Sequence, residues 1–295
     1  MELLRKIVSG ILLALLLVGV LVLAFNVQPV KAVPKTVYVD DDNTAGPWDG
    51  TPEHPYQNIT SGLEYASEGD TIFVYNGTYY EVVAVNKSVI LIGENRETTI
   101  INGCIQVMAS NAIIQEFAVQ NAYWGGGGIE LTNSNNTLVS RNIVLISVDS
   151  GIVLHSCFNT NLTDNIVMNC RDEGIYVTGS SNTLRNNSIA NCTYNFGALG
   201  YNDIDTSNTI NGKSVYYFVN QHSLVLNPST LPNVGYLGLT NCTNIIVEGL
   251  TLARNKLGVQ LYYTNNSVIR NLDLQDNELS IYQYSSVSNA ITGNN

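Results

Sequence analysis

The chain has 295 residues, of which 45% are hydrophobic and 13% are charged, and its formal net charge at pH 7 is −11. Apolar residues recur along the whole length, which excludes a disordered composition and is enough for one large domain or two small ones. The shortage of Lys and Arg excludes a nucleic-acid-binding protein, because such proteins neutralise phosphates with basic side chains.

The N-terminal segment has the pattern of an export signal. Arg5 and Lys6 precede an apolar run over residues 7–25, and Val30-Lys31-Ala32 offers small residues at a cleavage position. We therefore predict a signal peptide over residues 1–32 and an exported protein that is secreted, periplasmic or held at the cell surface. The apolar run is long, so an uncleaved membrane anchor is the alternative. This segment carries a net charge of +2, so its removal takes the formal charge from −11 to −13.

A short helix is expected next. Three apolar residues fall at helical spacing between Pro55 and Gly69, namely Ile59, Leu63 and Ala66. This spacing predicts an amphipathic helix over residues 58–67, flanked by strands near residues 35–39 and 71–75.

An internal repeat of about 22–23 residues follows. A glycine that precedes an apolar-x-apolar triplet recurs in steps of 23, at Gly128, Gly151 and Gly174. A degenerate copy follows at Gly197, the pattern returns at Gly258, and Ser280 takes the glycine position 22 residues later. A second signal, an apolar residue three positions before Asn, runs in phase and ends at Asn142, Asn165 and Asn187. Leucine-rich repeats share this period, but here the rest of each period is again β-formers and Asn. We therefore predict an all-β parallel β-helix with one coil per period.

Stacking of the coils converts sequence spacing into contact. We expect one inward column of Ile129, Ile152, Ile175, Val259 and Ile281, and another of Leu131, Leu154, Val177 and Leu261. Asn142, Asn165 and Asn187 should stack as a ladder at a bend, where Asn and Gly supply left-handed backbone. The helix over residues 58–67 should cap the open N-terminal end of the array.

The repeat pattern is interrupted over residues 202–233, where we predict an insertion whose β-strands project from one face of the β-helix. We divide the remainder into a lead-in and cap over residues 33–104 and coils over residues 105–295. The sequence stops in mid-coil, so we expect the natural protein to continue or a partner to cover its end.

The stretch "NCRDEGIYV" supplies the candidate acids. Asp172 lies two residues before Gly174 and should stack over Asp149, two residues before Gly151, with Glu173 beside it. Carboxyls one coil apart suit the acid–base pair of a glycosidase or a shared Ca²⁺ ion. The alternative is a solvated turn in which Arg171 balances the charge, and this simpler interpretation is favoured.

Tyrosines supply candidate ligand-binding residues. We expect Tyr176 and Tyr282 to face outward on the glycine-led strand, with Tyr262, Tyr263 and Tyr284 nearby. Exposed rings along a β-helix can stack on sugars, and the equally open alternative is that they cover strand surface.

Three segments resemble a known family. "YVDDDNTAGPWDGTPEHPYQNI", "EGDTIFVYNGTYYE" and "NGKSVYYFVNQ" are similar to parts of pectin-lyase-like and NosD-like right-handed β-helix proteins. The resemblance covers roughly residues 35–295 and implies a right-handed coil. It also implies a possible periplasmic accessory role in the maturation of a copper enzyme.

The residues themselves give little support to a metal cofactor. Soft copper ligands would cluster, whereas the histidines lie far apart in the sequence. Cys170 and Cys192 should stack on adjacent coils, which indicates a buried pair or a disulfide more than a copper site. A Ca²⁺ loop at residues 40–43 does not match the EF-hand spacing. We predict no cofactor and no metal, with Ca²⁺ as the open possibility.

The sequence therefore predicts a β-helix repeat protein that binds an extracellular ligand without cleaving it, and polysaccharide is the expected ligand class. A polysaccharide hydrolase or lyase that uses Asp149, Asp172 and Glu173 is the first alternative, and a NosD-like accessory protein is the second. Membrane contact is expected only through the N-terminal segment.

Overall fold

The computed structural model describes residues 1–25, 33–122, 127–145 and 147–295, without the side chains of residues 4 and 17–25. It divides into two units, Met1–Val33 and Pro34–Asn295. The first unit contains helix α1 (Glu2–Phe25), and the expected cleavage site Val30-Lys31-Ala32 lies outside the described residues. Among the described residues, none of the helices combines the length and apolar character that crossing a membrane requires.

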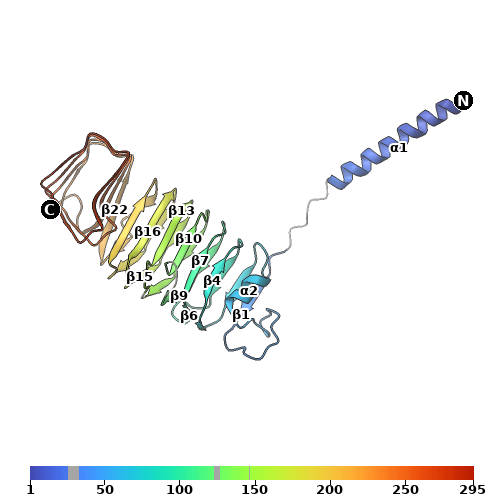
Figure 1. Cartoon of the computed structure of the whole chain (residues 1–295), viewed down its shortest axis with the longest axis horizontal. Helices are drawn as coiled ribbons and strands as arrows, with labels where there is room; N and C mark the ends of the chain where they lie inside the picture. The colour runs from blue at the N-terminus through green and yellow to red at the C-terminus, as the bar shows by residue number, and fades with distance from the viewer. Residues whose placement is uncertain (26–32, 123–126, 146) are drawn as a thin grey trace. The chain divides into compact units, whose positions relative to one another are not determined.

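The second unit is a β-helix whose coils stack so that equivalent strands form long sheets (Figure 1). The first sheet contains β1 (Thr36–Val39), β2 (Thr71–Val74), β5 (Ile90–Gly93), β8 (Ile113–Gln115), β11 (Leu138–Ser140), β14 (Asn161–Thr163), β17 (Thr183–Arg185) and β20 (Asp203–Ile204). The second sheet contains β4 (Val82–Val85), β7 (Cys104–Val107), β10 (Ile129–Thr132), β13 (Ile152–Phe158), β16 (Glu173–Ser180) and β19 (Tyr194–Leu199).

The third sheet runs furthest along the unit. It contains β3 (Gly77–Tyr79), β6 (Thr99–Asn102), β9 (Ala118–Gln120), β12 (Ile143–Leu145), β15 (Ile166–Met168), β18 (Ser188–Ala190), β21 (Thr209–Ile210), β22 (Lys213–Val219), β24 (Val234–Thr240), β27 (Leu257–Tyr262) and β30 (Leu279–Tyr284). Two shorter sheets contain β23 (Val225–Leu226), β25 (Ile246–Glu248), β28 (Val268–Arg270) and β31 (Ala290–Thr292), and β26 (Thr251–Ala253) with β29 (Asp273–Gln275). The predicted all-β, right-handed parallel β-helix is confirmed.

The core forms because alternate strand residues point inward and meet their equivalents one coil away. Ile129, Ile152 and Ile175 are register partners in the second sheet, and all three are fully buried. The predicted inward column is therefore confirmed over these coils.

The predicted short helix is present as α2 (Ile59–Tyr65), next to β1 and β2. Ile59 and Leu63 are buried in the core, and the Asn58 side chain caps the N-terminus by accepting a hydrogen bond from the Ser61 amide at 2.8 Å. Lys87 Nζ donates to carbonyls of the last turn, including that of Leu63 at 2.9 Å. The apolar face of the helix thus covers the first coil, as expected of an N-terminal cap.

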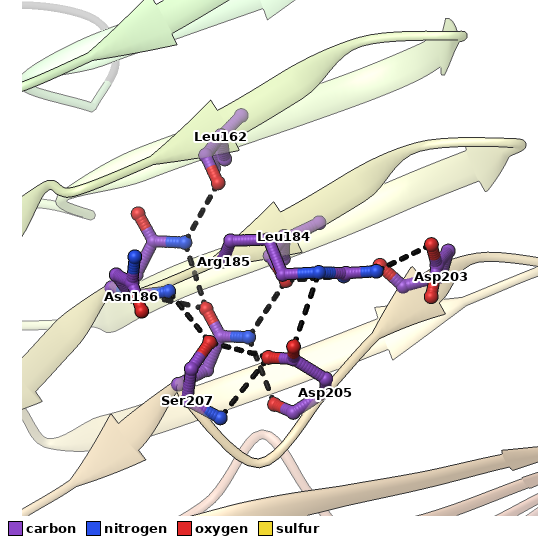
Figure 2. Close-up of polar contacts among 9 residues, drawn as sticks. Leu162, Leu184, Arg185, Asn186, Asp203, Asp205 and Ser207 are labelled. Atoms are coloured by element: carbon purple, nitrogen blue, oxygen red, sulfur yellow. Dashed lines mark hydrogen bonds and ion pairs between the residues drawn. The ribbon is translucent and has the colours of Figure 1, made fainter.

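The predicted asparagine ladder forms. The amide Nδ2 of Asn142 donates to Asn165 Oδ1 at 3.2 Å, Asn165 Nδ2 donates to Asn187 Oδ1 at 3.0 Å, and Asn187 Nδ2 donates to Asn208 Oδ1 at 2.8 Å. Asn187 and Asn208 also donate to the carbonyls of Leu162 and Leu184 at the end of the ladder, the region drawn in Figure 2.

The left-handed backbone lies one residue before each of the three predicted ladder asparagines. Arg141, Asp164 and Asn186 have φ values of 54°, 58° and 55°, so the ladder residues themselves are not the left-handed positions. The ladder side chains instead point inward and satisfy buried polar groups of the bend.

The coils are interrupted by a reversal of the chain. Strands β21 and β22 pair antiparallel, with Ile210 opposite Lys213. From this point the strands that carry the repeated motif, β24, β27 and β30 (with Ser280 in place of the glycine), extend the third sheet instead of the second. The segment over residues 202–233 is therefore a turning point between two stacks and not the excursion from one face that the sequence suggested. We call β1–β21 the first stack and β22–β31 the second stack.

The reversal breaks both predicted columns. In the second sheet, Phe196 follows Ile175 and Ala198 follows Val177. Val259, Ile281 and Leu261 belong to the third sheet, so they do not continue the columns of the first stack. Figure 1 shows the second-stack coils end-on as nested loops, whereas the strands of the first stack are seen from the side.

The second stack covers the end of the first. The Asn195 amide donates to the Arg254 carbonyl at 2.6 Å, and the Lys256 amide donates to the Phe196 carbonyl at 3.0 Å. The rings of Phe196 and Tyr236 pack edge to face with centroids 4.8 Å apart. The polar edge of β19 is thereby satisfied by the same chain.

Candidate functional site

A solvent-facing cleft lies on the outer face of the second sheet. The alternation that buries Ile129 and Ile175 turns Glu130 and Tyr176 outward. The cleft has a volume of about 340 Å³ and is lined by Gly127, Glu130, Asp149, Ser150, Val153, His155, Asp172, Glu173 and Tyr176. We call it the acidic cleft, and it contains all three predicted catalytic candidates.

The predicted neighbours Asp149 and Asp172 lie on adjacent coils. The Asp172 amide donates to the Asp149 carbonyl at 3.2 Å. The Ser150 hydroxyl, on the preceding coil, donates a hydrogen bond to Glu173 Oε2. Asp149 is exposed and Asp172 half-buried, whereas Glu173 is 6% exposed.

The next coil differs from the expected alignment. Gly197 pairs with Tyr176 and not with Gly174, because this coil is two residues shorter. A Cβ atom on Gly197 would lie 2.9 Å from Lys256 Cβ and 3.1 Å from Tyr176 Cδ2. The missing side chain at position 197 therefore provides the space in which Lys256, from the second stack, packs against the cleft.

Lys256 and Glu278 complete the site from the second stack. Lys256 Nζ lies 2.6 Å from Glu173 Oε1, 2.5 Å from Glu278 Oε2 and 5.7 Å from the centroid of the Tyr176 ring. The 22-residue repeat could have paired Lys256 with Glu278 on adjacent coils. Sequence reasoning missed their contact with Glu173, because only the reversal at β21–β22 brings the two stacks together.

The environment shifts the pKa values of the two adjacent carboxyls of the cleft, Asp172 and Glu173, in opposite directions. Burial disfavours ionisation of Glu173, but hydrogen bonds from Lys256 and Ser150 outweigh it and hold the pKa of Glu173 below its usual value. Burial and the negative charge of Glu173 raise the pKa of Asp172 to about 6, although Lys256 opposes this shift. At pH 7 both are ionised, and Asp172 gains its proton in mildly acidic solution.

Asp172, Glu173 and Glu278 could in principle hold a cation, since one carboxylate oxygen from each lies within 4.8 Å of the others. Lys256, however, already contacts Glu173 and Glu278, and hydrogen bonds to both carboxylates raise its pKa although burial alone would lower it. The Lys256 ammonium thus already lies between Glu173 and Glu278 and neutralises one of the three carboxylate charges, so a divalent ion would have to displace it.

The cysteines are the soft ligands that a copper site would use. All five are free and buried, as Cys104, Cys157, Cys170, Cys192 and Cys242. Cys170 and Cys192 lie on adjacent coils as predicted, and their mutual hydrogen bond together with burial raises the pKa of Cys170. The same hydrogen bond lowers the pKa of Cys192, so only the burial of the two side chains, 3% and 0% exposed, argues against a metal at this pair.

The predicted tyrosines separate into two places. Tyr176 lies in the acidic cleft under Lys256, and Tyr282 is half-buried on β30. A separate cluster contains the other three, Tyr262, Tyr263 and Tyr284. It also includes Tyr201, a residue that the sequence did not single out. The repeat predicts the pairing of Tyr262 and Tyr284, but not the arrival of Tyr201 from the first stack.

Comparisons with known proteins concern the fold. Residues 65–215 match the family model described as a right handed beta helix region. No curated protein matches the chain. Among solved structures, XylC in complex with xylose is 9% identical over 87% of this chain and 68% of its own, with a TM-score of 0.50. Carrot pectin methylesterase is 12% identical over 89% of each chain (TM-score 0.45), and the alginate lyase from Paenibacillus sp. str. FPU-7 is 11% identical over 88% of this chain and 97% of its own (TM-score 0.44).

Proposed function

Because the chain belongs to the right-handed β-helix family, we propose that it is an exported protein that binds an extracellular polysaccharide in the acidic cleft without cleaving it. The observation that supports binding is the composition of the cleft. Carboxylates of Glu130, Asp149 and Asp172 offer acceptors for sugar hydroxyls beside the Tyr176 ring, in an open hollow of about 340 Å³.

The absence of cleavage is proposed from the state of Glu173. A glycosidase needs one carboxyl as acid and a second as base or nucleophile. Both oxygens of Glu173 are engaged, one by Lys256 and the other by Ser150, and the residue is 6% exposed. Glu173 therefore serves as a structural anion that fixes the cleft.

A hydrolase is the second candidate function, and one observation favours it. The pKa of Asp172 is raised to about 6, which suits a general acid, and Asp149 is the neighbouring carboxyl. In this function Asp172 would protonate the leaving oxygen, and Asp149 would activate water or attack the sugar.

The two functions are separated by incubating the purified chain with neutral, uronate and amino-sugar polysaccharides. Affinity electrophoresis reports binding, while new reducing ends or unsaturated products report cleavage. We expect binding without products, and weaker binding in Asp172→Asn and Asp149→Asn. The exposed Asp276→Asn is the matched control, since it changes a carboxylate outside the cleft. Products that disappear in Asp172→Asn would establish the hydrolase instead.

A further inference from the structure

We propose a second carbohydrate-binding site, specific for neutral sugars, on the tyrosine cluster where the two stacks meet. We call Tyr201, Tyr262, Tyr263 and Tyr284 the tyrosine patch. The proposal rests on the proposed function for its ligand class, polysaccharide, but it does not depend on the acidic cleft.

The coil repeat builds the patch. Tyr262 and Tyr284 are register partners on β27 and β30, so their rings stack at 5.0 Å with an interplanar angle of 11°. Tyr263 packs edge-on against both, at 4.9 and 5.7 Å. Tyr201 reaches the patch from the first stack, with its ring centroid 6.3 Å from that of Tyr262. The four rings thus form one continuous surface.

The patch is open to solvent. Tyr201, Tyr263 and Tyr284 are 40%, 39% and 45% exposed. Contiguous exposed aromatic rings on a protein surface mark a binding site more often than isolated ones do. Their faces suit the apolar faces of sugar rings, and their hydroxyls can bond to sugar hydroxyls.

Tyr263 occupies a position that a tyrosine does not favour. It has a φ of 52°, and the preceding equivalents at the same bend are Asn220 and Asn241, with φ values of 57° and 52°. Asn tolerates this left-handed conformation, whereas a bulky residue is strained in it. The ring is therefore held at this bend at a cost to local stability, which indicates a role on the surface.

A hollow of about 420 Å³ adjoins the patch through Tyr201. The exposed side chains of Ser181 and Asn220 in its lining offer hydroxyl and amide groups for hydrogen bonds. The carboxylate in the lining, Asp203, is paired with Arg185 Nη2 at 2.5 Å (Figure 2). Arg185 is shared with Asp205, whose carboxylate lies 3.1 Å from its Nε atom, and none of the residues that line the hollow is basic. The lining thus offers no cation to a uronate and only an ion-paired carboxylate to an amino sugar, so it favours a neutral sugar over both.

The test uses calorimetric titration of the full chain with hexasaccharides of glucose, xylose and mannose, and with hexagalacturonate and hexaglucosamine as charged probes. We expect at least one neutral probe to bind more tightly than both charged ones. Tyr263→Asn, which installs the residue of the equivalent bends, should weaken that binding at least about fivefold while the fold is retained. Tyr80→Ser, an exposed tyrosine outside the patch, should leave it unchanged.

Three outcomes would overturn the proposal. These are the failure of every neutral probe to bind, tighter binding of a charged probe that Tyr263→Asn weakens, and neutral binding that Tyr263→Asn leaves intact. If Asp172→Asn alone abolishes binding, the tyrosine patch is not a site while the proposed cleft stands. If Tyr263→Asn alone abolishes it, the patch is confirmed, and the cleft is decided by its own test with the polysaccharide panel.

Discussion

Replacement of Lys256 with Met should destabilise the junction between the stacks. Met keeps the aliphatic packing over Gly197 and beside Tyr176 but removes the ammonium group that contacts Glu173 at 2.6 Å. The side chains of Glu173 and Lys256 are 9% and 20% exposed, so the variant leaves a nearly buried carboxylate without its partner. Breaking such a pair costs about 3–5 kcal/mol, and the residual exposure of Lys256 favours the lower end.

The loss should depend on pH. The pKa of Glu173 is lowered in the folded protein, so its pairing stabilises the fold above the unfolded pKa, and that contribution is lost as pH falls through the folded value. In Lys256→Met, burial is opposed mainly by Ser150, and the pKa of Glu173 should rise. The difference in unfolding free energy is therefore largest at pH 7 and shrinks on acidification toward pH 3.

Urea unfolding followed by circular dichroism at pH 7 and at pH 3 measures this difference. Lys213→Met, which changes an exposed lysine, is the matched control. The double variant Lys256→Met/Glu173→Gln should recover part of the loss, because Gln leaves no buried charge. An unchanged urea midpoint at pH 7, or an equal loss at both pH values, would refute the role of the buried pair.

Three further predictions concern the asparagine ladder, the raised pKa of Asp172 and the binding of metals. Asn165→Ala should lower stability by about 2–4 kcal/mol, since it removes four buried hydrogen bonds, whereas the exposed Asn161→Ala should change the urea midpoint little. NMR of ¹³C-labelled aspartate should show a carboxyl that titrates near pH 6 and is absent in Asp172→Asn; in Glu173→Gln its midpoint should fall, and an unchanged midpoint would contradict the assigned cause. Calorimetric titration with Ca²⁺, Cu(I) and Cu(II) should show no tight site, because the Lys256 ammonium already occupies the acidic cluster and the cysteines are buried, and stoichiometric micromolar binding would contradict this.

The sequence predicts the parts of this molecule that depend on one period. Gly151 and Gly174 are spaced by one coil, so the adjacency of Asp149 and Asp172 follows from counting residues, as does the ladder from Asn142 to Asn187. Periodicity carries this information because each coil contacts mainly its immediate neighbours.

The sequence does not predict what the reversal brings together. Lys256 meets Glu173, and Tyr201 meets Tyr262, across a turn whose direction depends on the antiparallel pairing of β21 with β22. The same limitation explains why the sequence pattern places Val259 and Leu261 in the inward columns of the first stack. The glycine-led motif is the same before and after the interruption, so the sequence does not reveal that these residues belong to the third sheet. The repeat specifies neighbours within a stack, but not the contact between stacks.

The covered end of the first stack has a consequence for cooperativity. In a linear repeat array, terminal units have one neighbour and fray, so their amide protons exchange fastest. Here one end is covered by α2, and the other is covered by the second stack through Phe196 and Tyr236. The outermost coils of the first stack should therefore open together with the central ones, and amide hydrogen exchange at β19 should be as slow as at β13. The first stack should thus unfold as a single unit, although it is built as a linear array of coils.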